Sequence, residues 1–103
     1  MRIIVEETNV PKLKVGSLFL VTYTGGSLGR EGDHAVLISD LNVSKFHAKF
    51  AFSEAVGCYT VTDMGSRNGT FLNGKRLSVA LQESEAETVQ HSSVIQVWAS
   101  CLE

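Results

Sequence analysis

The sequence has little proline, little cysteine and no long apolar run. It contains one proline and two cysteines among 103 residues. No stretch approaches the roughly 18 apolar residues that a membrane-spanning helix needs. The cysteines, at positions 58 and 101, are too few and too far apart for a disulfide framework or a zinc site. We therefore expect reduced cysteines, an intracellular protein of the nucleus or cytoplasm, and neither a metal nor a cofactor.

The sequence also lacks an excess of positive charge. Nine Lys and Arg residues stand against eleven Asp and Glu residues, for a net charge of −2. A general surface for nucleic acid is therefore not expected, and any anion site must be local. The length suits one globular domain, which we predict over residues 1–103 as a monomer that binds no membrane. The chain ends soon after its last predicted strand, so we expect a domain excised from a longer protein.

Helical periodicity is nearly absent from the sequence. Short apolar runs rich in Val, Phe and Thr alternate with glycine turns, which predicts an all-β sandwich. Strands are expected over residues 2–5 at a sheet edge, 17–23 buried on both faces, 27–30, 35–38, 47–52, 58–63 and 94–98 as the closing strand. The polar segment 82–90 has no apolar periodicity and is predicted to be a loop.

The most informative stretch is residues 65–74, with the sequence GSRNGTFLNG. It holds two Asn-Gly pairs, at 68–69 and 73–74, on either side of an apolar pair. Asn-Gly is a strong hairpin signal because both residues tolerate the positive φ of a type I′ turn. The stretch therefore predicts a loop, a very short strand and a tight turn. Loops run over the surface of a domain, so Arg67 and Asn68 are expected to be accessible.

Polar side chains gather in three short segments at strand ends or in loops. These segments are 29–30 (GR), 44–47 (SKFH) and 65–70 (GSRNGT). The planar fork of arginine matches phosphate oxygens, lysine adds a point charge and serine donates one hydrogen bond. An asparagine amide can bond the backbone of an extended peptide. Together the segments suit a dianionic phosphate carried by a peptide.

The same segments resemble the forkhead-associated (FHA) domain in their order and spacing. The likeness rests on Gly29-Arg30, on the Ser-x-x-His of Ser44 and His47, and on the Asn-Gly-Thr of 68–70 followed by Asn-Gly at 73–74. The resemblance spans roughly residues 16–98. Within it, segments 16–19 and 43–48 resemble one particular member of the FHA family. The resemblance implies an FHA-type β-sandwich of about eleven short strands whose loops bind phosphothreonine peptides.

By this resemblance, the site residues have two roles. The contact residues are Arg30, Ser44 and Lys45 for the phosphate, Asn68 for the peptide backbone, Arg67 in the same pocket, and Asn42 toward residues after the phosphothreonine. The supporting residues are Gly29, His47, Gly69 and Thr70, with His47 bracing the Ser44 loop. The chain departs from the family pattern near its end, where HSS at 91–93 replaces a common Gly-Asp.

Two other functions compete with phosphopeptide binding. One is a hydrolase with Ser44 as nucleophile, His47 as base and Asp63 as orienter. Residues three apart in an extended segment lie about 10 Å apart, and no nucleophile-elbow pattern surrounds Ser44, so we predict that the chain is not an enzyme. The other is a phosphorylation-independent scaffold of the same fold, which would bind phosphorylated and unphosphorylated partners equally.

The remaining ring-bearing residues receive structural interpretations. His34 and His91 are predicted to be solvated loop histidines. Phe71 and Trp98 are predicted to be core residues, because no basic stripe accompanies them as it would in a nucleic-acid platform.

Overall fold

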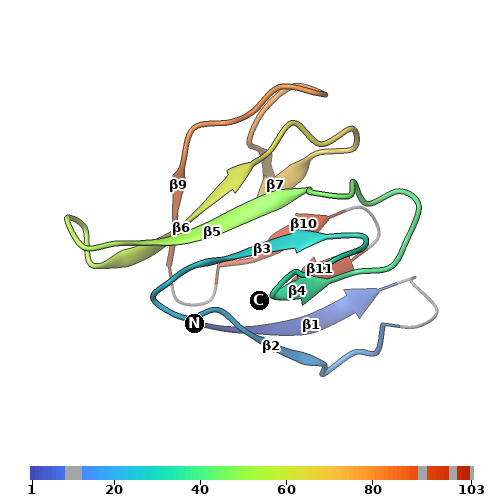
Figure 1. Cartoon of the computed structure of the whole chain (residues 1–103), viewed down its shortest axis with the longest axis horizontal. Coiled ribbons are helices and arrows are strands. Elements are labelled where there is room, and N and C mark those ends of the chain that lie inside the picture. Colours follow the sequence, from blue (N-terminus) through green and yellow to red (C-terminus); the bar gives the residue numbers. More distant parts are fainter. Residues whose placement is uncertain (9–12, 91–92, 98–99, 103) are drawn as a thin grey trace.

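The computed structural model describes residues 1–8, 13–90, 93–97 and 100–102. These residues form eleven strands in two sheets (Figure 1), which confirms the predicted all-β sandwich. Within those ranges no helix has the length and apolar character needed to cross a membrane.

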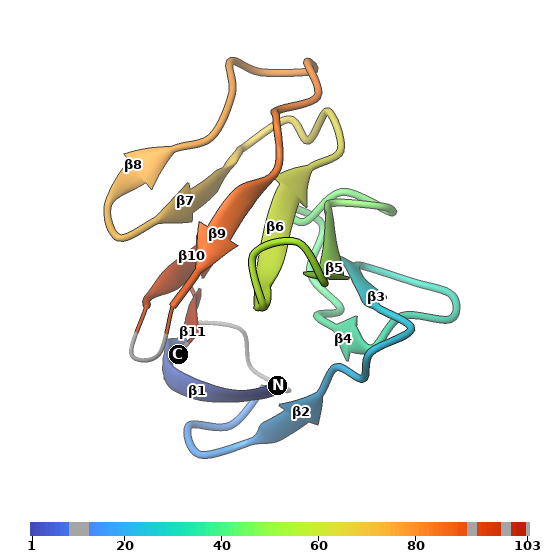
Figure 2. The ribbon, with the colours of Figure 1, turned by 90° about the vertical axis from the view of Figure 1, so that its left-hand side faces the viewer.

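Each sheet combines strands from distant parts of the chain (Figure 2). The six-stranded sheet has the order β2-β1-β11-β10-β7-β8, with β1 (Arg2–Thr8), β2 (Leu18–Leu20), β7 (Thr70–Leu72), β8 (Lys75–Arg76), β10 (Ile95–Val97) and β11 (Ser100–Leu102). The five-stranded sheet has the order β4-β3-β5-β6-β9, with β3 (Gly26–Gly29), β4 (Val36–Leu37), β5 (Ala48–Ser53), β6 (Cys58–Asp63) and β9 (Glu87–Val89). The β3–β4 pair is parallel and the other pairs are antiparallel.

The core lies between the sheets and follows the alternation of the strands. On β5, Ala48 and Phe50 are buried while Lys49 is exposed, and Val61 is the buried partner of Phe50 on β6. Side chains of alternate residues point to opposite faces of a sheet, so a six-residue strand contributes one apolar face. The buried apolar residues are Ile3, Val5, Val21, Leu28, Val36, Ile38, Val43, Ala48, Phe50, Val61, Ile95 and Val97.

Two strand predictions are wrong about the place of the strand in its sheet. β1 is not an edge, because it pairs with β2 on one side and with β11 on the other. β2 is itself an edge, and its Leu18 and Leu20 are exposed rather than buried. An apolar run indicates a strand but carries no information about which strands will flank it.

The C-terminal predictions also need correction. The segment predicted as a loop contains β9, which pairs with β6 through Tyr59 and Val89. β10 is not the closing strand, because β11 follows it and pairs with β1. Strands pair through main-chain hydrogen bonds, so a strand can form in a segment whose side chains show no apolar periodicity. Trp98 and His91 lie outside the described residues.

The predicted tight turn at 73–74 is confirmed. Asn73 and Gly74 have φ values of 51° and 85°, and they join β7 to β8 in the register Phe71 to Arg76. Both central residues have positive φ, as a type I′ turn requires. In the other Asn-Gly pair, only Gly69 has a positive φ, of 88°.

Candidate functional site

Three loops meet at one end of the sandwich, on the right in Figure 1. The N–H of Arg30 donates to the carbonyl oxygen of Ser44 (3.1 Å), and the N–H of Arg67 donates to Ser44 Oγ (3.3 Å). Asn68 Nδ2 donates to the carbonyl oxygen of Asn42 (2.7 Å). These bonds join segments far apart in the sequence, and Lys45 follows Ser44 directly. The structure therefore brings together all the residues that the sequence predicts as contacts.

His47 lies behind the cluster and is wholly buried. Its Nδ1 accepts the N–H of Ser44 (3.1 Å), so its protonated Nε2 donates to the carbonyl oxygen of Gly69 (2.9 Å). The neutral ring with a proton on Nε2 satisfies both bonds. Burial lowers the pKa of His47, while the bond to Gly69 and the charge of Asp63 act in the opposite direction. His47 thus ties the Ser44 loop to the 65–70 loop.

The arrangement does not form the serine–histidine pair of a hydrolase. Both ring nitrogens of His47 are engaged with backbone groups, and Ser44 Oγ accepts from the backbone of Arg67. An activated nucleophile needs its hydroxyl within hydrogen-bond reach of the base. The ring braces the loop that carries Ser44, and its hydrogen bonds go to backbone groups.

Asp63 organises the 65–70 loop and was missed as a supporting residue. It is wholly buried at the end of β6. One carboxylate oxygen accepts the hydroxyls of Ser66 (2.6 Å) and Thr70 (2.7 Å). The other accepts the N–H groups of Gly65 (3.2 Å) and Ser66 (3.0 Å) and the hydroxyl of Ser78 (3.2 Å). The available signal was an Asp placed two residues before a Gly-Ser pair, because Asp side chains bond the backbone two or three residues on.

Close packing explains the glycine at position 29. A Cβ there would collide with the carbonyl oxygen of Lys45 and with the ring of His34. That ring is half-buried, bonds Ser27 Oγ through Nδ1 (2.7 Å) and packs against the ring of Phe46 with centroids 5.6 Å apart. The prediction of a solvated His34 is therefore wrong.

Charged and amide side chains at the mouth of the cluster are already oriented. Lys45 Nζ lies 3.5 Å from a carboxylate oxygen of Glu31, with both side chains largely exposed. Arg30 Nη1 donates weakly to the carbonyl oxygen of Leu41 (3.4 Å). Asp40 accepts both the N–H (2.8 Å) and the side-chain amide (3.1 Å) of Asn42. Among the described residues no group of His, Cys, Asp and Glu could hold a metal ion.

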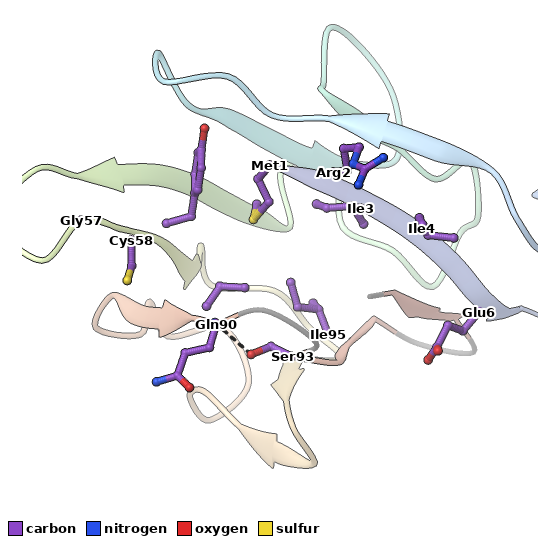
Figure 3. Close-up of a pocket in the computed structure, with 12 residues that line it drawn as sticks. Met1, Arg2, Ile3, Ile4, Glu6, Gly57, Cys58, Gln90, Ser93 and Ile95 are labelled. Atoms are coloured by element: carbon purple, nitrogen blue, oxygen red, sulfur yellow. Dashed lines mark hydrogen bonds between the residues drawn. The ribbon is translucent and has the colours of Figure 1, made fainter.

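A separate pocket of about 670 Å³ opens between β1 and the β6–β9 pair (Figure 3). Ile3 and Ile95 are buried beneath it, and the N–H of Gln90 donates to Ser93 Oγ (3.0 Å) at its rim. It is lined by Met1, Arg2, Ile3, Ile4, Glu6, Gly57, Cys58, Tyr59, Val89, Gln90, Ser93 and Ile95. None of the predicted contact residues belongs to this lining.

The fold and the site define a β-sandwich domain whose polar groups gather in loops at one end. The chain belongs to the FHA family, since the family model described as the FHA domain matches residues 26–97. The human protein Angiogenic factor with G patch and FHA domains 1 is 34% identical over 95 residues. That match covers 89% of this chain and 13% of the human protein, so the chain spans about an eighth of its relative. The narrower resemblance indicated by segments 16–19 and 43–48 is to this protein, and it is confirmed.

Solved structures share the fold at low identity. The kinase-interacting FHA domain of a kinase-associated protein phosphatase from Arabidopsis superposes with a TM-score of 0.81 at 21% identity, covering 98% of this chain and 88% of that one. A structure described in terms of phosphothreonine-dependent FHA domain interactions gives 0.74 at 19% identity, covering 98% and 90%. These likenesses establish the FHA sandwich.

Proposed function

We propose that this chain is a non-enzymatic interaction module that binds phosphothreonine peptides. In this proposal Arg30, Ser44 and Lys45 hold the phosphate, and Asn68 holds the peptide backbone beside it. The observation that supports it most is the bonding of the Arg30, Ser44 and Arg67 segments into one accessible cluster. Membership of the FHA family and the phosphothreonine-dependent interactions of a similar structure support it further.

The hydrogen bonds around Ser44 leave the right group for a phosphate. Its Oγ accepts from the backbone of Arg67, so the hydroxyl proton remains to be donated to a phosphate oxygen. Phosphothreonine carries about −1.5 to −2 charge at neutral pH. A charge-assisted hydrogen bond contributes roughly 1.5–3 kcal/mol. A serine, a lysine and a guanidinium acting together would therefore discriminate strongly against an unphosphorylated threonine.

Lys45 can transfer from Glu31 to a phosphate at small cost. The two side chains are 71% and 62% exposed. An ion pair this exposed contributes about 0–1 kcal/mol, because water screens it and side-chain entropy opposes it. A dianionic phosphate offers the same ammonium group more charge.

Asn68 is oriented for an extended peptide. One N–H of its amide is used by the carbonyl oxygen of Asn42. The second N–H and the side-chain oxygen would then pair with a carbonyl and an N–H of a peptide backbone. Asn42, whose carbonyl oxygen accepts the bond from Asn68, would contact residues after the phosphothreonine.

The test is a calorimetric titration with an oriented phosphothreonine peptide library. Phosphoserine and unphosphorylated versions of the same peptides serve as controls. Selective binding of phosphothreonine would support the proposal and reveal the preferred flanking residues. Equal or absent binding across all three would refute it and favour the phosphorylation-independent scaffold.

A further inference from the structure

Arg76 lies beside Asn68, although it belongs to none of the three predicted segments. The two-residue turn at 73–74 sets Arg76 opposite Phe71, and the N–H of Leu77 donates to the carbonyl oxygen of Thr70 (3.0 Å). Continuing that antiparallel register makes position 69 the diagonal neighbour of Arg76 on the same face, within reach of a long side chain. The hairpin geometry thus sends this arginine back toward the loop cluster.

The guanidinium of Arg76 lies across the backbone of Gly69. A Cβ on Gly69 would fall 2.8 Å from Arg76 Nε and 2.9 Å from Cζ. Nε donates to the carbonyl oxygen of Ser78 (2.7 Å) and Nη2 to that of Arg67 (3.3 Å). Arg76 therefore touches the residues on both sides of Asn68, whose Cα atoms are each about 3.8 Å from that of Asn68.

Among the described residues, no ion pair neutralises the positive charges of Arg76 and Arg67. Across the described ranges, no carboxylate oxygen lies within 4.0 Å of the guanidinium of Arg76 or Arg67. The ion pair found in those ranges joins Lys45 to Glu31. Both arginines are exposed. Arg76 uses two of its five N–H donors in the two bonds above, which leaves three for a ligand. Exposed, partly unused guanidinium groups are the usual partners of carboxylate and phosphate oxygens.

We propose that Arg76 and Arg67 form a second anion subsite, which takes a carboxylate or a second phosphate on the bound phosphopeptide. The inference rests on the proposed function, because it needs Asn68 to hold the peptide backbone beside the phosphothreonine. An extended peptide advances about 3.3–3.6 Å per residue, so the second anion should lie within about three residues of the phosphothreonine. The subsite makes this module selective for phosphothreonine in an acidic or doubly phosphorylated segment.

The experiment is a double-mutant cycle between peptide and protein. A phosphothreonine peptide in an alanine background carries one Asp, or one phosphoserine, at each of the four positions before and after the phosphothreonine. Dissociation constants are measured for the wild type, Arg76→Gln and Lys75→Gln. Lys75 is the matched control, because it is the adjacent exposed cation and its side chain leaves β8 on the opposite face.

The expected result is a gain confined to one or two positions. There, Asp should strengthen binding by about three- to tenfold in the wild type, and phosphoserine by more. The gain should vanish in Arg76→Gln and persist in Lys75→Gln. Arg67→Gln gives a second measurement and should reduce the same gain. Among the described residues, the hydrogen bonds of Arg67 are made by its main chain, so the substitution leaves them in place.

Three results would overturn the subsite. Arg76→Gln could weaken every peptide by the same factor, which would make Arg76 only a brace for the 65–70 loop. The Asp gain could survive in both arginine variants, or no position could show a gain. If instead the wild type fails to bind the singly phosphorylated alanine peptide, the proposed function itself is wrong and the subsite falls with it.

Discussion

The loop cluster and the pocket differ in the side chains that form them and in how those side chains are hydrogen-bonded. The loop end is held by buried polar side chains, with His47, Asp63, Ser66 and Thr70 almost fully excluded from water. The pocket has apolar walls between two sheets and a polar rim. In the part of the chain that the structure describes, every buried side-chain nitrogen and oxygen has a hydrogen-bond partner. The loop end is therefore a fully satisfied network.

This difference shows why the loop cluster, and not the pocket, is the better candidate site. Buried and mutually satisfied polar groups rigidify the loops that carry them. Loops that are ordered before the ligand arrives lose less entropy on binding, so more of the interaction energy appears as affinity. The pocket lies outside this network, because none of His47, Asp63, Ser66 and Thr70 lines it. Substitutions made separately in the loop cluster and in the pocket should therefore have different effects on stability and on peptide binding.

The largest effect is expected from Asp63→Ala. The change leaves the buried hydroxyls of Ser66 and Thr70 without their acceptor, and each such loss costs about 1–3 kcal/mol. We expect the free energy of unfolding to fall by about 4 kcal/mol in urea denaturation. Asp33→Ala, at an exposed acid outside the network, should change it by less than about 0.5 kcal/mol. A loss below about 1 kcal/mol for Asp63→Ala would contradict the network.

His47→Ala should lower the free energy of unfolding by about 3 kcal/mol. It removes two hydrogen bonds that join the loops and leaves a cavity in a close-packed region. Thermal denaturation measures the change. An unaltered melting temperature would show that His47 does not brace the Ser44 loop.

The pH dependence of stability gives a second measurement on His47. Burial lowers the pKa of His47 below the ordinary 6.5. Between these two pKa values the imidazole is protonated in the unfolded chain and neutral in the folded chain. The stability contribution is complete above pH 6.5 and is lost as the pH falls toward the lowered pKa. His47→Gln should flatten this part of the stability curve. An identical slope in the variant would assign the pH dependence to other groups.

Arg30→Ala should weaken phosphopeptide binding about ten- to a hundredfold, through the loss of roughly 1.5–3 kcal/mol. The melting temperature should stay within a few degrees, because the side chain makes one weak bond to Leu41. Arg2→Ala, at the rim of the pocket, is the control and should leave affinity unchanged. Wild-type affinity in Arg30→Ala would remove this residue from the site.

The smallest effect is expected from filling the pocket. Cys58→Leu adds apolar volume to the lining without touching the loops. The dissociation constant for a phosphothreonine peptide should change less than twofold, which is under about 0.4 kcal/mol. A tenfold change would mean that the pocket and the loop cluster are coupled through the sandwich.

Much of the fold and of the site could be predicted because the relevant signals are local. Alternation identified β5 and β6, and Asn-Gly at 73–74 identified the turn between β7 and β8. The polar segments around Arg30, Ser44 and Asn68 were visible as residue types in short loops. The predictions failed where pairing crosses long distances, as in β9, β11 and the edge position of β2. Phe71, predicted as core, is half-buried beneath the guanidinium of Arg76.

The sequence by itself determined the β-rich class, the tight turn and the chemical groups of the loops, because turn preference and alternation depend on near neighbours. Only the tertiary structure decided that these groups meet at one end of the sandwich. It also decided that Asp63 holds the 65–70 loop and that Arg76 reaches Gly69. Those contacts depend on strand register and burial, which arise when distant segments pack together, and no local pattern encodes them.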